Sequence, residues 1–406
     1  MRPSFRVDEC SNVWYNYRMQ RTIRLRLAPS PLQAETLSET TRQFTSAFNQ
    51  TVMVGWDAGV GNATKLHYLT YYPVKAEHPT LVSDLIVQAR MKAAEALRSA
   101  FALQKQNRQV SMPVSAACPP RYNVHTYKLD WESQTVRIST TRGRHTIRFD
   151  IPEYSQKYAG FPVGTADLMA RDGTWWLHVV VTVPAPALEA TDAVVGVDLG
   201  LTRPAVTSEN RFLGKRRWKA IEGRTFHLKR ALQKKGTKSA KRHLRRLMYM
   251  QARFRRNCDH VLSKQIVQSA EPGSTIVVEN LTDIRKRVKA KKRTETKRRI
   301  HSWSFAQLRT LIEYKAEERG CRVVAVDPRH TSQQCSRCGH TARNNRRSRG
   351  RFVCRACGLE LHADLNAARN IAAKYQASVG TSDAGGLPCH AANRVGPSGP
   401  DASCLL

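Results

Sequence analysis

The chain has 406 residues, of which 41% are hydrophobic, so it can form two or three domains with their own cores and is not disordered throughout. Its 67 lysines and arginines outnumber its 32 aspartates and glutamates and leave a net charge of +35. A compact protein with this charge repels itself unless a polyanion neutralises it, so nucleic acid is the expected partner and binding should be sensitive to salt. A membrane surface is the alternative partner, but the charge is spread over most of the chain and no lipidation signal is evident.

No stretch of the sequence approaches the roughly 18 apolar residues of a transmembrane helix. The polar start, Met1–Cys10, is not typical of a secretory signal. Four of the ten cysteines form a metal-binding pattern, and the other six are scattered without the spacing of a disulfide framework. These features predict a protein of the reducing cytoplasm.

In the first half of the chain, strand and helix patterns follow one another. Residues 21–28 alternate between apolar and polar types and predict a strand. Residues 31–56 carry apolar positions at helical spacing after Ser30, a suitable N-cap, and residues 80–106 predict a second helix.

Short alternating runs follow these helices and predict strands at 134–138, 145–149 and 175–181. The simplest architecture is a small antiparallel barrel or sandwich with a helical insertion. We expect residues 1–30 and 107–186 to form this β-rich module and residues 31–106 to form the insertion.

The second half follows an α/β pattern after a linker rich in Ala and Pro at 184–191. Its predicted elements are, in chain order, strand 194–199, basic helices across 217–270, strand 274–279, helix 303–319, strand 322–327 and a helix from Asp364 to about Tyr375. A cysteine-rich segment at 331–358 interrupts this pattern. Residues 377–406, rich in Gly, Ser, Pro and Ala, predict a disordered tail.

Three acidic residues lie where these elements begin or end. Asp198 interrupts an apolar strand, Glu279 ends the next one, and Asp364 begins the last helix. A carboxylate at the end of a buried strand is costly unless something pairs with it. Three converging carboxylates could hold two magnesium ions about 3.5–4 Å apart and hydrolyse a phosphodiester. Taken singly, each acid is better explained as a turn residue, an arginine partner or a helix cap, whereas the three together in a basic protein favour the metal site.

Four cysteines form two C-x-x-C pairs separated by 15 residues: Cys335, Cys338, Cys354 and Cys357. This spacing predicts a zinc ribbon, in which Gly339 and Gly358 relieve backbone strain beside the sulfurs. Four thiolates fill the coordination shell of zinc, so the metal should be structural. The alternative, a redox dithiol, lacks the expected sequence context.

Basic residues gather in three segments that are expected to contact phosphates. Ten of the sixteen residues from Ile284 to Arg299 are lysine or arginine, and the helical stretch 241–256 and the ribbon tip 344–351 are also basic. Each run alone would be read as a solvated face, but their number favours a continuous surface that binds phosphates without reading sequence. The candidate nucleic-acid-binding residues are Arg245, Arg246, Arg285, Lys286, Arg287, Lys291, Lys292, Arg346 and Arg347. Trp303 and Phe305 are expected to pack in the core rather than to stack on a base.

The motifs of the second half resemble, in order, those of the TnpB family, the RNA-guided nucleases encoded by small insertion sequences. They are GVDLG at 196–200, VENL at 278–281, DPRHTSQQCSRCG at 327–339, FVCRACG at 352–358 and ADLNAARNIA at 363–372. The first half is similar to the family only in layout. One departure is His362, because many members have an aspartate two residues before the acid that matches Asp364.

The resemblance implies a RuvC domain of RNase H-like fold at 192–330 and 359–376, with the zinc ribbon 331–358 inserted into it. It implies that Asp198, Glu279 and Asp364 are the catalytic residues, that the first module is wedge-like and that its helical insertion serves recognition. It also implies a guide RNA that pairs with double-stranded target DNA while the protein reads a short adjacent duplex motif. A cytoplasmic, nucleoid-associated prokaryotic protein that acts as a monomer is expected.

We therefore predict a magnesium-dependent, RNA-guided DNA endonuclease associated with an insertion sequence, with one structural zinc and two catalytic magnesium ions. One alternative is a compact type V CRISPR effector that uses a CRISPR RNA. Another is a guided DNA-binding repressor descended from such a nuclease. A DNA-strand transposase is the third, but the sequence has no separate strand-transfer machinery that we can identify.

Overall fold

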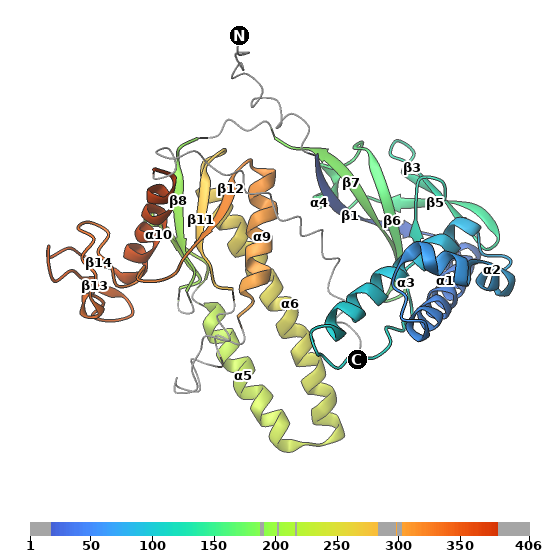
Figure 1. Cartoon of the computed structure of the whole chain (residues 1–406), viewed down its shortest axis with the longest axis horizontal. Coiled ribbons are helices and arrows are strands. Elements are labelled where there is room, and N and C mark those ends of the chain that lie inside the picture. Colours follow the sequence, from blue (N-terminus) through green and yellow to red (C-terminus); the bar gives the residue numbers. More distant parts are fainter. Residues whose placement is uncertain are drawn as a thin grey trace, which may run out of the picture. The chain divides into compact units, whose positions relative to one another are not determined.

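The computed structural model describes residues 18–186, 191–200, 203–215, 217–282, 298 and 303–380. The chain divides between Ala185 and Pro186 into two compact units, within the segment predicted as a linker. Figure 1 shows the elements of each unit.

The first unit contains a seven-stranded sheet in the order β2-β6-β7-β1-β5-β4-β3, with antiparallel neighbours. Its strands are β1 (Arg18–Ala28), β2 (Arg121–Tyr122), β3 (Tyr127–Asp130), β4 (Thr135–Thr140), β5 (Gly143–Asp150), β6 (Val163–Arg171) and β7 (Thr174–Pro184). The hydroxyl of Tyr127 on the edge strand β3 donates a hydrogen bond of 2.7 Å to the carbonyl of Gly164 on β6. This bond joins parts of the sheet that lie far apart in strand order, so the sheet is nearly closed.

Three helices follow β1: α1 (Pro31–Asp57), α2 (Ala63–Glu77) and α3 (Ser83–Gln104). Helices α1 and α3 contact the sheet, and α2 packs against α1 and α3. Ser30 and Gln33 form a capping box at the start of α1, which stabilises the helix where the sequence predicts it. The sequence predicted two helices here, and α2 was not predicted. Its interior Pro73 hid it, because proline removes a backbone donor and ordinarily ends a helix. A short helix, α4 (Glu153–Gln156), completes the unit.

The second unit contains a five-stranded sheet in the order β10-β9-β8-β11-β12. Its strands are β8 (Val194–Asp198), β9 (Ala205–Thr207), β10 (Phe212–Leu213), β11 (Thr275–Glu279) and β12 (Arg322–Val326). Strands β8, β11 and β12 are parallel, whereas β9 and β10 run antiparallel to their neighbours. The sequence did not predict β9 and β10, because strands of two or three residues are too short to show a periodic pattern.

Helices cover both faces of this sheet: α6 (Lys238–Ser269) and α9 (Phe305–Glu318) lie on one face and α10 (Ala363–Gly380) on the other (Figure 1). The core between the sheet and the helices α6 and α9 includes Val197, Ile266, Val278 and Ile312. Helix α10 extends to Gly380, so residues 377–380, predicted as part of a disordered tail, are helical. Residues 381–406 lie outside the described part of the chain.

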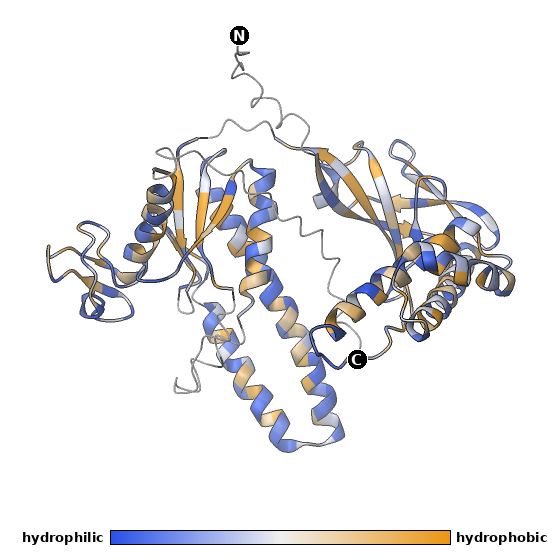
Figure 2. Cartoon of the chain, in the orientation of Figure 1, coloured by the Kyte–Doolittle hydropathy of each residue, from blue (hydrophilic) through white to orange (hydrophobic). Residues whose placement is uncertain are grey.

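Helix α5 (Arg217–Lys235) and the first half of α6 form a helical hairpin beyond the sheet (Figure 1). None of the side chains of α5 is buried, and the hairpin is largely hydrophilic (Figure 2). Arg255 pairs with Glu222 at 2.9 Å and Lys229 donates to Gln251 at 3.2 Å, so polar contacts join the two helices. The hairpin therefore presents cationic side chains to solvent. Within the described ranges, no helix combines the length and the hydrophobicity needed to cross a bilayer.

Candidate active site and zinc ribbon

Asp198 and Glu279 end two adjacent parallel strands. Val197 of β8 is the register partner of Val278 of β11, so the two acids follow side by side at the carboxyl edge of the sheet. Val195, Val197, Ile276 and Val278 point into the core shared with α6 and α9. Since side chains alternate along a strand, the two acids point to the opposite face, where α10 lies.

Gly196 brings α10 close to the same place. A Cβ atom added at Gly196 would lie 2.1 Å from the carbonyl oxygen of Ala368 and 2.7 Å from the amide nitrogen of Ala372, so the helix backbone rests directly on β8. Asp364 lies one turn before Ala368, on the same side of the helix. Asp198 lies two residues beyond Gly196, on the same face of the strand. This packing brings the acids from distant parts of the sequence to one end of the sheet.

The other two acids affect the protonation of Asp198. Burial is the largest cause of the rise in the pKa of Asp198 to about 8, and the negative charges of Glu279 and Asp364 contribute to this rise. The positive charge of Arg346 lowers this pKa. Burial also raises the pKa of Glu279, although a hydrogen bond from Thr331 opposes this shift. Buried carboxylates that repel one another are a donor set suited to a divalent cation with oxygen ligands, such as Mg²⁺.

Among the described residues, the cysteine quartet is the one group whose candidate ligand atoms all lie within 4.8 Å of one another. The three acids do not form such a group among the described residues. Arg346 pairs with one of these acids, because its Nη2 donates to Asp364 Oδ1 at 3.1 Å. Arg346, predicted to contact phosphate, thus pairs with a predicted catalytic acid, and Arg347 beside it is exposed.

Two further side chains reach the acids, and the sequence did not point to them as site residues. The hydroxyl of Thr331 donates to Glu279 Oε1 at 2.6 Å. His362 Nδ1 accepts a hydrogen bond of 3.3 Å from the amide of Asp364 and lies 4.0 Å from its Oδ2. His362 stands where many TnpB proteins have an aspartate, so an imidazole replaces that acid beside Asp364. Residue spacing gave no signal that Thr331 would contact Glu279.

The four cysteines of the predicted ribbon meet in space. The sulfurs of Cys335 and Cys357 lie 3.7 Å apart, and those of Cys338 and Cys354 lie 3.6 Å apart. A tetrahedral zinc ion with Zn–S bonds of about 2.3 Å requires neighbouring sulfurs about 3.8 Å apart, so the quartet fits zinc. A backbone hydrogen bond from Cys357 lowers the pKa of the Cys354 thiol, which favours the thiolate that zinc binds.

The two knuckles share one backbone geometry. The amide of Gly339 donates to the carbonyl of Cys335 at 2.9 Å, and the amide of Gly358 donates to that of Cys354 at 3.2 Å. Both glycines have positive φ, 74° and 70°, which explains why glycine follows each cysteine pair. Strands β13 (Arg351–Val353) and β14 (Glu360–His362) form the hairpin that carries the second pair, and a short 3₁₀ turn, η1 (Arg343–Asn345), lies between the pairs.

The predicted nucleic-acid contacts fall in different parts of the molecule. Arg245 and Arg246 are exposed on α6. Trp303 packs against the core of the second unit, as the sequence predicted. The centroid of its ring lies 3.3 Å from the centroid of the Phe305 ring. Five of the predicted residues lie outside the described residues: Arg285, Lys286, Arg287, Lys291 and Lys292.

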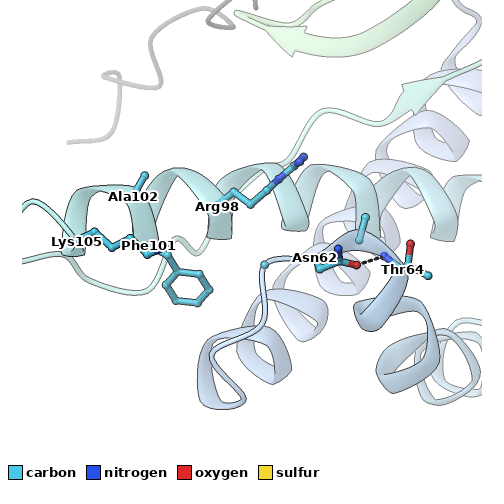
Figure 3. Close-up of a pocket in the computed structure, with 8 residues that line it drawn as sticks. Asn62, Thr64, Arg98, Phe101, Ala102 and Lys105 are labelled. Atoms are coloured by element: carbon cyan, nitrogen blue, oxygen red, sulfur yellow. Dashed lines mark hydrogen bonds between the residues drawn. The ribbon is translucent and has the colours of Figure 1, made fainter.

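Two cavities with cationic and aromatic walls lie away from the acids. One, of about 440 Å³, lies between the start of α2 and the end of α3, where Arg98, Phe101 and Lys105 line it (Figure 3). The other, of about 340 Å³, lies at the α5–α6 hairpin and includes Trp218 and Arg224. Neither cavity is lined by a predicted catalytic acid.

Comparison with known proteins places these features in a family context. The family model described as Cas12f1-like, TNB domain, matches residues 305–371, which span α9, the ribbon and the start of α10. The chain is 35% identical over 118 residues to a TnpB-like protein of Methanocaldococcus jannaschii, covering 29% of this chain and 41% of that protein. It is 27% identical over 403 residues, 94% of this chain and 95% of the relative, to a Streptomyces pristinaespiralis protein whose name proposes an RNA-guided DNA endonuclease.

A shorter match has higher identity. The chain is 44% identical over 123 residues to the CRISPR-associated endodeoxyribonuclease Cas12f1 of Sulfoacidibacillus thermotolerans, which covers 30% of this chain and only 27% of that protein. Among solved structures, the Cas12f1 chain of a cryo-EM complex with sgRNA and target DNA aligns with a TM-score of 0.60 at 15% identity, over 88% of this chain and 98% of that one. The structural match shows a common fold, and the relatives confirm the resemblance that the motifs predicted.

Proposed function

From the premise that this chain is a TnpB-like protein, we propose that it is an RNA-guided DNA endonuclease that hydrolyses DNA phosphodiesters at Asp198, Glu279 and Asp364. The observation that carries the proposal is the convergence of these acids at the carboxyl edge of β8 and β11 beneath the start of α10. Guide RNA and double-stranded target DNA are the proposed partners, and an insertion sequence is the proposed genetic context.

The order of elements supports a RuvC-like domain for the second unit. An antiparallel hairpin, β9–β10, flanks β8 on one side, and the parallel strands β11 and β12 flank it on the other. The α5–α6 hairpin separates β10 from β11 in the chain, and the zinc ribbon separates β12 from α10. This order supports the split nuclease domain that the resemblance implies, in which zinc would stabilise the inserted ribbon.

The three acids would hold two Mg²⁺ ions, which supply activation of the attacking water and stabilisation of the leaving oxygen. Asp198 must lose its proton to serve as a ligand, and the raised pKa means that cation binding and deprotonation occur together. Arg346 lies beside Asp364 and can exchange this carboxylate for a phosphate oxygen when DNA enters, since guanidinium binds both groups. The exposed basic face of α6 would hold nucleic acid through its phosphates.

The test is to replace Asp198 by Ala or Asn and measure both cleavage and target binding by the protein–guide RNA complex. Cleavage should fall below detection, because a metal ligand is lost, while binding persists because it depends on base pairing and phosphate contacts. The control is Glu209→Gln, which removes an exposed acid in the turn between β9 and β10 that pairs with Arg211 at 3.4 Å. Wild-type cleavage rates in the Asp198 variants would disprove the proposed site.

A compact type V effector is the second candidate, favoured by the match to the Cas12f1-like TNB model. Sequencing the RNA that copurifies with the protein from its native host separates the two: RNA from the 3′ end of the protein's own gene indicates the insertion-sequence system, and CRISPR RNA indicates the effector. A guided repressor would bind its target without cutting. Cleavage by the wild-type protein would therefore exclude a repressor, and binding without cleavage would support one.

A further inference from the structure

Thr331 connects the predicted metal site with the zinc ribbon. Its side chain is 2% exposed and lies between β12 and the first cysteine knuckle. The hydroxyl donates to Glu279 Oε1 at 2.6 Å and also lies 3.0 Å from the carbonyl oxygen of Pro328. The hydroxyl of a buried threonine can form its hydrogen bond with the nearby backbone alone. The contact with a carboxylate on another strand therefore additionally constrains the position of that carboxylate.

Two buried asparagines of α10 hold the backbone on both sides of this contact. Asn370 Nδ2 donates to the carbonyls of Thr331 at 2.8 Å and Gln334 at 2.7 Å. Asn366 Nδ2 donates to the same Gln334 carbonyl at 2.7 Å, and its Oδ1 accepts from the amide of Ser336 at 3.0 Å. The two asparagines are four residues apart and share a helix face.

This set of hydrogen bonds is continuous from the ribbon to the acid. Ser336 directly follows Cys335, a predicted zinc ligand, and Glu279 lies at the other end of the chain of contacts. Helix α10, which carries both asparagines, also carries Asp364. The orientation of Glu279 is therefore tied to the same helix and knuckle that place Asp364.

We propose that Thr331 is a positioning residue that holds the Glu279 carboxylate ready for Mg²⁺, and that Asn366 and Asn370 fix Thr331 by binding the first zinc knuckle. This inference rests on the proposed function of Glu279 as a metal ligand. A carboxylate ligand that loses its hydrogen-bond partner becomes free to rotate, and such losses reduce metal affinity by about 10- to 100-fold.

The test compares Thr331→Val, which keeps the side-chain shape and removes the hydroxyl, with Thr331→Ser, which keeps the hydroxyl. Calorimetric titration of Mn²⁺ into the full chain measures metal affinity without nucleic acid, and the Mg²⁺ dependence of cleavage is measured in parallel. In Thr331→Val the Mn²⁺ Kd should rise about 10- to 100-fold, and cleavage should recover in part at high Mg²⁺. Thr331→Ser should remain close to wild type in both measurements.

The matched control is Thr341→Val, because Thr341 is an exposed ribbon threonine whose hydroxyl bonds the Gly339 carbonyl. Zinc content and circular dichroism verify that each variant folds, and Thr331→Ala replaces Thr331→Val if the latter loses zinc. Unchanged Mn²⁺ affinity in a folded variant that lacks the hydroxyl overturns the positioning role. Glu279→Gln separates this outcome from failure of the proposed function: wild-type cleavage by that variant would mean that Glu279 is not a metal ligand at all.

Discussion

At the scale of the residue, the protonation of Asp198 couples the predicted metal site to stability. The pKa of this residue in the folded, metal-free protein is about 8, against a usual value of 3.8, because it is buried near Glu279 and Asp364. Between these pH values the folded state holds a proton that the unfolded state has released. The free energy of unfolding should therefore fall as the pH rises through this window, by the contribution of Asp198.

The raised pKa of Asp198 predicts that Asp198→Asn stabilises the metal-free protein at alkaline pH. Thermal unfolding should give a higher Tm for the variant than for wild type near pH 8, and the difference should shrink toward about pH 5, where Asp198 is protonated in the fold. Adding Mg²⁺ near pH 8 should raise the Tm of wild type more than that of the variant. An equal Tm for both proteins across this range would show that Asp198 is not a buried, repelled carboxylate.

At the scale of the element, the contact between β8 and α10 sets the geometry of the predicted active site. Glycine at 196 is required because any side chain there meets the backbone of α10 at Ala368 and Ala372. Backbone atoms of a helix cannot rotate out of the way, unlike a flexible side chain. The helix must therefore move as a whole, and Asp364 moves with it.

We expect Gly196→Ala to destabilise the second unit by about 1–3 kcal/mol, the usual cost of overpacking, and to reduce cleavage strongly. Urea unfolding and the cleavage assay measure these two effects. Gly164→Ala is the control, because the nearest atom to its added Cβ lies 3.6 Å away on another strand, β7. If both glycine variants behave alike, the close approach of α10 to β8 is not what places Asp364.

At the scale of the whole molecule, the net charge of +35 dominates the expected behaviour with nucleic acid. Each phosphate contact releases a counterion, so the logarithm of the affinity for guide RNA should fall linearly with the logarithm of the salt concentration. Arg245→Ala should lower the magnitude of this slope by about 1, because it removes one exposed cationic contact on α6. Filter binding over a range of salt concentrations measures the slope.

The matching control is Arg42→Ala. Arg42 is exposed, but its guanidinium is already held by Glu39 at 2.6 Å, so its charge is largely compensated within the protein. Its removal should leave the salt slope almost unchanged. The same slope for Arg245→Ala and wild type would place the nucleic acid away from the α5–α6 hairpin.

The sequence by itself determined the features that depend on local chemistry. Alternation and helical spacing located β1, β7, α1 and α6, because each buries one regular face of a continuous segment. Continuous apolar runs located β8 and β11, which are buried on both faces. The C-x-x-C spacing and the glycines after it identified the ribbon, since knuckle geometry is local to each pair. The acids at strand ends were recognisable because a charge that follows an apolar run is costly without a partner.

Only the tertiary structure decided which side chains meet across distant segments. Arg346 was predicted as a phosphate contact, yet it pairs with Asp364, and Thr331 reaches Glu279 from a loop 52 residues further along the chain. Helix α2 was hidden by Pro73, and β9 and β10 were too short to show a period. Such contacts follow from strand register and from the close packing of α10 on Gly196, which no spacing along a single segment encodes.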